Sequence, residues 1–115
     1  MTATIIELDQ EGAASILRIA GDITSGSDTD LMAAYGLATA NGASAVILDF
    51  SKLEYMNSGG IGLLVTLLVR AQRSGGRLIA TGLSEHYREI FSLTRLDEAI
   101  EIHQDEAAAI AAVEA

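Results

Sequence analysis

The sequence contains no cysteine, no proline and no tryptophan, and it has 7 basic residues against 16 acidic ones. Without cysteine there are no disulfides, no thiolate nucleophiles and none of the commonest zinc ligands. The formal net charge of −9 argues against binding to a nucleic acid backbone or an anionic membrane surface. Two isolated histidines, His86 and His103, do not make a metal site, so we expect no metal and no cofactor.

The 115 residues are enough for one domain with one hydrophobic core, and we expect residues 1–115 to form a single domain. The first residues lack a basic region followed by an apolar one, so they do not resemble a signal peptide. The longest strongly apolar stretch, 59–69, is far shorter than the ~20 residues needed to cross a bilayer. These features predict a cytoplasmic protein without membrane insertion.

Segments of alternating polarity and helical periodicity predict an α/β domain. The predicted strands are 4–9, 15–20, 45–50, 77–81 and 100–103, and the predicted helices are 27–40, 57–74, 84–92 and 105–113. Residues 51–56 are predicted to be a loop, and the alanine-rich last helix is expected to pack weakly and to fray. The order of elements predicts a mixed central sheet of about five strands with about four helices mainly on one face.

The segment 49–62 joins the predicted central strand to the start of the most apolar helix. Ser58 would stand where unpaired N–H groups and the positive end of the helix dipole converge, so the fold would tolerate a phosphate on its hydroxyl. Gly59, Gly60 and Gly62 would leave the surface beside it bare for a partner. Phosphorylation would add about −1.5 to −2 charges, which that partner would have to bury.

Local chemistry alone leaves other interpretations of Ser58 open. A plain helix N-cap, worth about 1 kcal/mol, accounts for a serine at this place. Residues 59–62 match neither G-x-G-x-x-G nor a phosphate loop. A nucleophile elbow would need glycine in place of Met56, so a triad of Ser58 with Asp97 and His103 has little support and we expect no enzyme.

Three motifs carry a family resemblance along the whole chain. The first, Gly21-Asp-Ile-Thr24, is similar to a G-E-[IL]-[DT] motif, and the second is the apolar strand predicted at 46–50. The third, Met56-Asn-Ser-Gly-Gly-Ile-Gly62, is similar to M-D-S-[ST]-G-[LI]-G. Together they resemble the STAS domain, which is shared by bacterial anti-sigma factor antagonists and the cytoplasmic tails of sulfate transporters. Two positions depart from the pattern, because Asn57 replaces the usual aspartate and Gly59 replaces a second hydroxyl residue.

The resemblance implies the STAS fold and a role as an anti-sigma factor antagonist. In that branch the serine matching Ser58 is phosphorylated by an anti-sigma factor that is an ATP-dependent serine kinase. The unphosphorylated form would bind this kinase and release a sigma factor, phosphorylation would switch it off, and a phosphatase would reset it. The implied partner surface consists of Asp22, Thr24, Asn57, Ser58, Gly59, Gly60 and Ile61.

Two alternatives remain open within the same resemblance. One is a STAS subunit that supports the ATPase of a lipid or solute ABC transporter, and the other is a scaffold in a large stress-sensing assembly. Leu63 or Leu67, if exposed on the second helix, would mark a partner surface. A group of acidic residues is expected to be a solvated face or else a contact for a basic partner: Asp97, Glu98, Glu101, Asp105 and Glu106.

Overall fold

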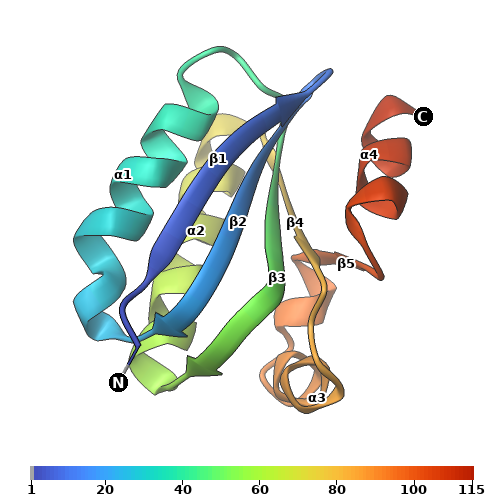
Figure 1. Cartoon of the computed structure of the whole chain (residues 1–115). Coiled ribbons are helices and arrows are strands. Elements are labelled where there is room, and N and C mark those ends of the chain that lie inside the picture. Colours follow the sequence, from blue (N-terminus) through green and yellow to red (C-terminus); the bar gives the residue numbers. More distant parts are fainter. Residues whose placement is uncertain (1) are drawn as a thin grey trace.

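A five-stranded sheet lies at the centre of the computed structural model, which describes residues 2–115 (Figure 1). The strands follow one another across the sheet in sequence order, as β1 (Ile5–Glu11), β2 (Ala14–Ile23), β3 (Ala45–Met56), β4 (Arg77–Thr81) and β5 (Glu101–His103). β1 is antiparallel to β2, and the other neighbours are parallel. The predicted mixed sheet is therefore confirmed.

Helices cover both faces of the sheet unequally. Residues 2–115 form four α-helices, which are α1 (Asp28–Thr39), α2 (Ser58–Ser74), α3 (Glu85–Leu93) and α4 (Glu106–Glu114). They also form two short 3-10 helices, η1 (Ser25–Ser27) and η2 (Leu96–Glu98). The first three helices pack on one face, and α4 lies alone on the other (Figure 1). No helix within residues 2–115 is long and apolar enough to span a membrane.

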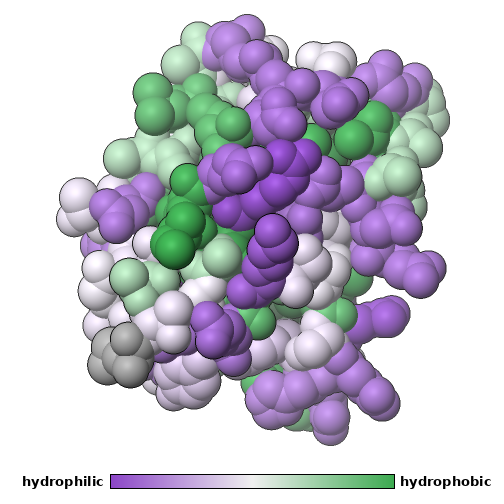
Figure 2. Space-filling view, in the orientation of Figure 1, coloured by the Kyte–Doolittle hydropathy of each residue, from purple (hydrophilic) through white to green (hydrophobic). Residues whose placement is uncertain are grey.

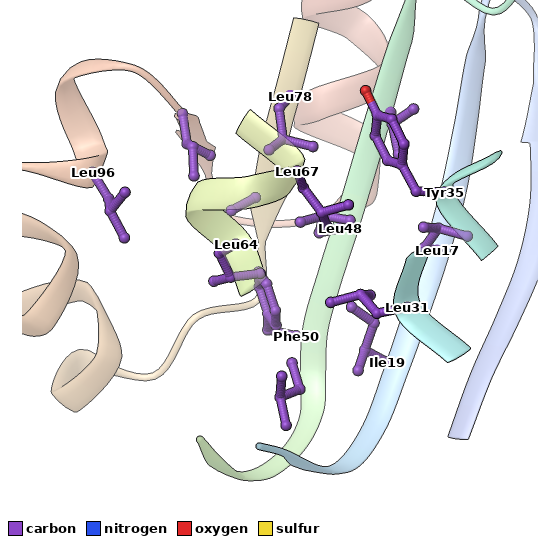
Figure 3. Packing of buried hydrophobic residues seen from close by; sticks show 14 of the residues in the cluster. Leu17, Ile19, Leu31, Tyr35, Leu48, Phe50, Leu64, Leu67, Leu78 and Leu96 are labelled. Atoms are coloured by element: carbon purple, nitrogen blue, oxygen red, sulfur yellow. The ribbon is translucent and has the colours of Figure 1, made fainter. Parts of the chain in front are cut away.

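The alternation of side chains along the strands divides the core into two layers. Leu17 of β2 and Leu48 of β3 face the larger layer, where Figure 3 shows Leu64 of α2 directed toward the same strands. Ile16 and Ile47, the neighbours of those two strand residues, face the smaller layer under α4. Outside this layer the α4 face is largely hydrophilic, with hydrophobic atoms in separate patches (Figure 2).

The prediction of a loop at 51–56 is wrong, because β3 continues to Met56. The extension pairs with β2 as far as Ile23 through two irregularities in register. β4 ends at Thr81, opposite Asp49, so the extension has a strand on one edge alone and most of its side chains are exposed. Residues 51–56 lack the apolar run that is typical of a buried strand. Hydrogen bonds to the backbone of β2, and not burial of side chains, maintain this part of β3.

The expectation of weak packing for the alanine-rich last helix is also wrong. Ala109 is fully buried against Ile16 and Ile47, and Ile110 and Val113 pack beside it. Because an alanine side chain is small, the axis of α4 can approach the sheet closely. Asp105 caps the helix, as predicted, by accepting a hydrogen bond from the backbone of Ala108 at 2.9 Å.

Candidate functional site

Ser58 is the first residue of α2 and is exposed to solvent. The preceding Asn57 caps the helix, since its Oδ1 accepts a hydrogen bond from the Gly60 N–H at 3.0 Å. The first intrahelical bond joins the Ile61 N–H to the Asn57 carbonyl at 3.0 Å. The amides of Ser58 and Gly59 lie at the helix start, where no carbonyl of a preceding turn exists to accept from them.

A second turn lies beside the start of α2 and extends the surface around Ser58. Thr24 caps η1 by accepting from the Gly26 N–H at 3.2 Å, and the Ser27 hydroxyl accepts from the Thr24 N–H at 3.0 Å. A Cβ atom added at Gly59 would lie 2.9 Å from the backbone nitrogen of Ser25. The absence of a side chain at Gly59 therefore allows η1 and α2 to form one contiguous surface.

Gly60 does not belong to this surface, and its prediction as a bare partner contact is wrong. It is buried, and a Cβ atom there would collide with the carbonyl oxygen of Ile23 and lie 2.8 Å from Cγ of Met56. Its role is close packing of α2 against the ends of β2 and β3. Gly62 is exposed with nothing within 4 Å of an added Cβ, so it does leave bare surface.

Asp22 is also withdrawn from the surface, contrary to the prediction that it contacts a partner. It is 8% exposed, and its Oδ2 accepts a hydrogen bond from the Thr2 N–H at 3.0 Å. Its backbone carbonyl accepts from the Thr4 hydroxyl at 2.6 Å. The side chain of Asp22 thus fixes the N-terminal segment against the end of β2.

The outer side of α2 carries an apolar stripe that begins at Ser58. Gly62, Val65 and Val69 follow it at spacings of four, three and four residues, which place them on the same side of the helix. Val65 is 42% and Val69 38% exposed. Leu67 is fully buried in the core and Leu63 is half-buried, so the condition that would have marked a partner surface at these two leucines is not met.

Three acidic side chains at the same end of the molecule are exposed. Asp28 and Asp30 lie in the first turn of α1, directly after η1, and Glu54 lies on the extension of β3. None of the three forms an ion pair within residues 2–115. The segments that lead into η1, α1 and α2 therefore carry exposed negative charge that no ion pair among the described residues compensates.

The acidic group near the C-terminus, in contrast, is largely neutralised by arginines of the same chain. Ion pairs join Glu98 to Arg95 at 3.1 Å, Glu101 to Arg77 at 2.7 Å and Glu106 to Arg18 at 2.8 Å. The hydrogen bonds from Arg18 hold the pKa of Glu106 at about 2. The pairs of Glu101 and Glu106 attach β5 and α4 to neighbouring strands, whereas the Glu98 pair is an exposed surface pair. The hypothesis of a basic partner therefore fits Glu101 and Glu106 poorly.

The two histidines and Asp97 do not assemble with Ser58. His86 is exposed and packs edge-on against the Tyr87 ring at 4.9 Å, and His103 lies 3.8 Å from Glu101 on β5. Asp97 belongs to η2 and lines a surface groove with α3. Among the described residues no cluster of three potential metal ligands occurs. Neither histidine and no other residue of the proposed triad lies beside Ser58 among the residues that the structure describes.

Comparison with known proteins agrees with this fold. Residues 6–103 match the family model described as "Mlab, STAS domain". BtrV of Bordetella bronchiseptica, named as a candidate anti-sigma factor antagonist, is 24% identical over 89 residues, which cover 77% of each chain. An anti-sigma factor antagonist from Mycobacterium paratuberculosis superposes with a TM-score of 0.84 at 20% identity, over 98% of this chain and 96% of that one.

A third similar structure is the Bacillus cell fate determinant SpoIIAA in its phosphorylated form, with a TM-score of 0.70 and 22% identity over 91% of this chain and 96% of that one. The family model spans most of the chain, and the TM-scores show that the chain shares the fold of these structures. The protein belongs to the STAS domain family.

Proposed function

We propose that this STAS domain is a cytoplasmic anti-sigma factor antagonist. Its unphosphorylated form binds an anti-sigma factor that is also a serine kinase, and this binding releases a sigma factor. Phosphorylation of Ser58 by that kinase ends the binding, and a phosphatase restores it. The observation that carries the proposal is the exposed hydroxyl of Ser58 at the capped start of α2, contiguous with η1. The domain acts by binding and not by catalysis.

The charge around Ser58 explains how one phosphate would act as a switch. The segments 21–30 and 53–62 contain no lysine or arginine, so no side chain of these segments would neutralise the phosphate. The amides at the start of α2 would stabilise it within the domain. A partner packed on η1 and the apolar stripe would have to bury the dianion, at a cost of about 3–5 kcal/mol of binding energy.

The partner that fits this surface has an apolar centre and a basic border. Ile61 and Val65 offer apolar contact next to Ser58, and Asp28, Asp30 and Glu54 supply uncompensated negative charge. Charge complementarity of this kind raises association rates and excludes acidic proteins. Besides Ser58, the fold leaves four of the predicted contact residues accessible at this surface: Thr24, Asn57, Gly59 and Ile61.

Intact mass spectrometry tests the proposal directly. The protein is incubated with ATP and the histidine-kinase-like ATPase encoded nearest to it, and Ser58→Ala is the control. We expect a gain of one phosphate, about 80 Da, that the control lacks. Ser58→Asp should lose binding to the ATPase while its melting temperature stays within about two degrees of the wild type. Ser58→Ala should bind constitutively.

Two other results would point away from this function. Unfolding of Ser58→Asp would show that the hydroxyl serves the fold. Stable binding to a transporter ATPase without phosphate transfer would instead support the second role, that of a STAS subunit of an ABC transporter.

A further inference from the structure

The hydroxyl of Tyr87 on α3 accepts a hydrogen bond from the backbone N–H of Met56 at 2.8 Å, inside the core. Met56 is the last residue of β3 and stands two residues before Ser58. Tyr87 is 9% exposed and lies 31 residues further along the chain. A side chain from a different element thus binds the backbone at the point where β3 turns into α2.

The geometry of the sheet explains why this hydrogen bond is needed. Successive N–H groups of a strand point to opposite edges. The Asn57 N–H donates to the Ile23 carbonyl of β2 at 3.3 Å, so the Met56 N–H points away from β2. β4 ends opposite Asp49 and cannot receive it. The phenol oxygen of Tyr87 accepts the hydrogen bond that a neighbouring strand on this edge would otherwise accept.

We propose that Tyr87 is a positioning residue for the Ser58 site. The end of β3 is held on one edge by the Tyr87 hydroxyl and on the other by the Ile23 carbonyl. In the first turn of α2, Gly60 packs against the same Ile23 carbonyl. These contacts fix the direction in which Asn57 and Ser58 leave the sheet. Loss of the hydroxyl would leave a buried N–H unpaired and would loosen this turn. The consequence for partner binding rests on the proposed function.

Tyr87→Phe tests the proposal, because phenylalanine keeps the ring in the core and removes only the oxygen. Tyr35→Phe is the matched control, since Tyr35 is 3% exposed and lies at the opposite end of the sheet, beside Val46. Amide hydrogen exchange of Met56 is measured against that of Ile47 in the same strand, and binding of the anti-sigma ATPase is measured in parallel.

In Tyr87→Phe the exchange of the Met56 amide should accelerate at least about tenfold while that of Ile47 changes little. Binding to the ATPase should weaken about three- to tenfold, with both quantities unchanged in Tyr35→Phe. Equal acceleration at Met56 and Ile47, or faster exchange with unaltered affinity, would overturn the positioning role. If the wild type binds no anti-sigma ATPase, the proposed function fails, and the exchange ratio alone still decides whether Tyr87 holds the turn.

Discussion

Glu106, the first residue of α4, accepts two hydrogen bonds from the guanidinium of Arg18 on β2, at 2.8 Å and 2.9 Å. The pair joins residues 88 positions apart and connects the start of the last helix to the open face of the sheet. Arg18 also donates to Glu7 and Asp9 of β1, at 3.0 Å and 3.2 Å. One arginine therefore links β1, β2 and α4.

Glu106→Gln should destabilise the protein by about 1–2 kcal/mol at neutral pH, because it removes a charge-assisted, partly exposed pair. The pKa of Glu106 in the folded state is about 2, below its ordinary value of 4.5. Its stabilising contribution is therefore present above pH 4.5 and is lost as the pH falls toward 2. Denaturant unfolding at several pH values checks this. Glu54→Gln, at an exposed glutamate that forms no ion pair among the described residues, controls for the loss of one negative charge.

Asp49→Asn should have the opposite effect. Burial, with Glu106 beside it, raises the pKa of the Asp49 carboxyl above its ordinary value of 3.8. Because the protonated carboxyl is favoured in the folded state, Asp49 stabilises the protein at pH values below 3.8. This contribution is lost as the pH rises through the pKa that Asp49 has in the folded state. Asparagine can still accept from the Ser51 N–H, which lies 2.9 Å from Asp49. The variant should be more stable than the wild type at pH 7 and equal to it near pH 3, as measured by unfolding in urea.

Gly60→Ala and Gly62→Ala should change stability in opposite directions, although both glycines lie in the first turns of α2. At Gly60 a methyl group collides with the Ile23 carbonyl, so we expect a loss of about 1–3 kcal/mol. At Gly62 nothing lies within 4 Å, and alanine should add about 0.5–1 kcal/mol through its higher helix propensity. Thermal unfolding compares the two. A stable Gly60→Ala protein would contradict the packing of α2 on β2.

This pair of glycines shows how far the sequence predicts the site. The turn chemistry and the apolar run before it correctly placed Ser58 at the start of a helix after a central strand. The sequence does not distinguish Gly60 from Gly62, because that difference depends on which neighbour lies across from each Cα in three dimensions. The burial of Asp22 escaped prediction for the same reason, since its partner is the backbone of Thr2.

The helices and strands were predicted correctly wherever burial of one face gives the sequence a periodic hydrophobic pattern. Local propensity failed at the extension of β3, whose strand pairs on one edge and shows little hydrophobic alternation. For α4 it predicted the helix but not its packing, because a run of alanines signals a helix without showing that Ala109 is buried against the sheet. Tyr87 was missed because nothing local marks a tyrosine that binds Met56, 31 residues away.

Asn57→Asp tests the departure from the family motif. Aspartate keeps the cap on the Gly60 N–H and adds a negative charge at the helix start, so the unmodified protein should be as stable as the wild type or slightly more stable. If the missing charge weakens kinase recognition, the variant should be phosphorylated faster than the wild type. Equal rates would show that the charge is irrelevant. Asn57→Ala, which loses the cap, should cost about 1 kcal/mol by thermal unfolding.

Two fully buried hydroxyls provide the last prediction. The Ser15 hydroxyl donates to the Ala38 carbonyl at 2.6 Å, whereas the Thr81 hydroxyl has no hydrogen-bond partner within residues 2–115. Ser15→Ala removes a satisfied bond and should destabilise the protein by about 1–2 kcal/mol. Thr81→Val keeps the shape and removes a desolvated polar atom, so unfolding in urea should show equal or higher stability. A loss of more than 1 kcal/mol in Thr81→Val would mean that this hydroxyl is hydrogen-bonded in solution, and the junction of β3, β4 and β5 would then be more polar than its packing indicates.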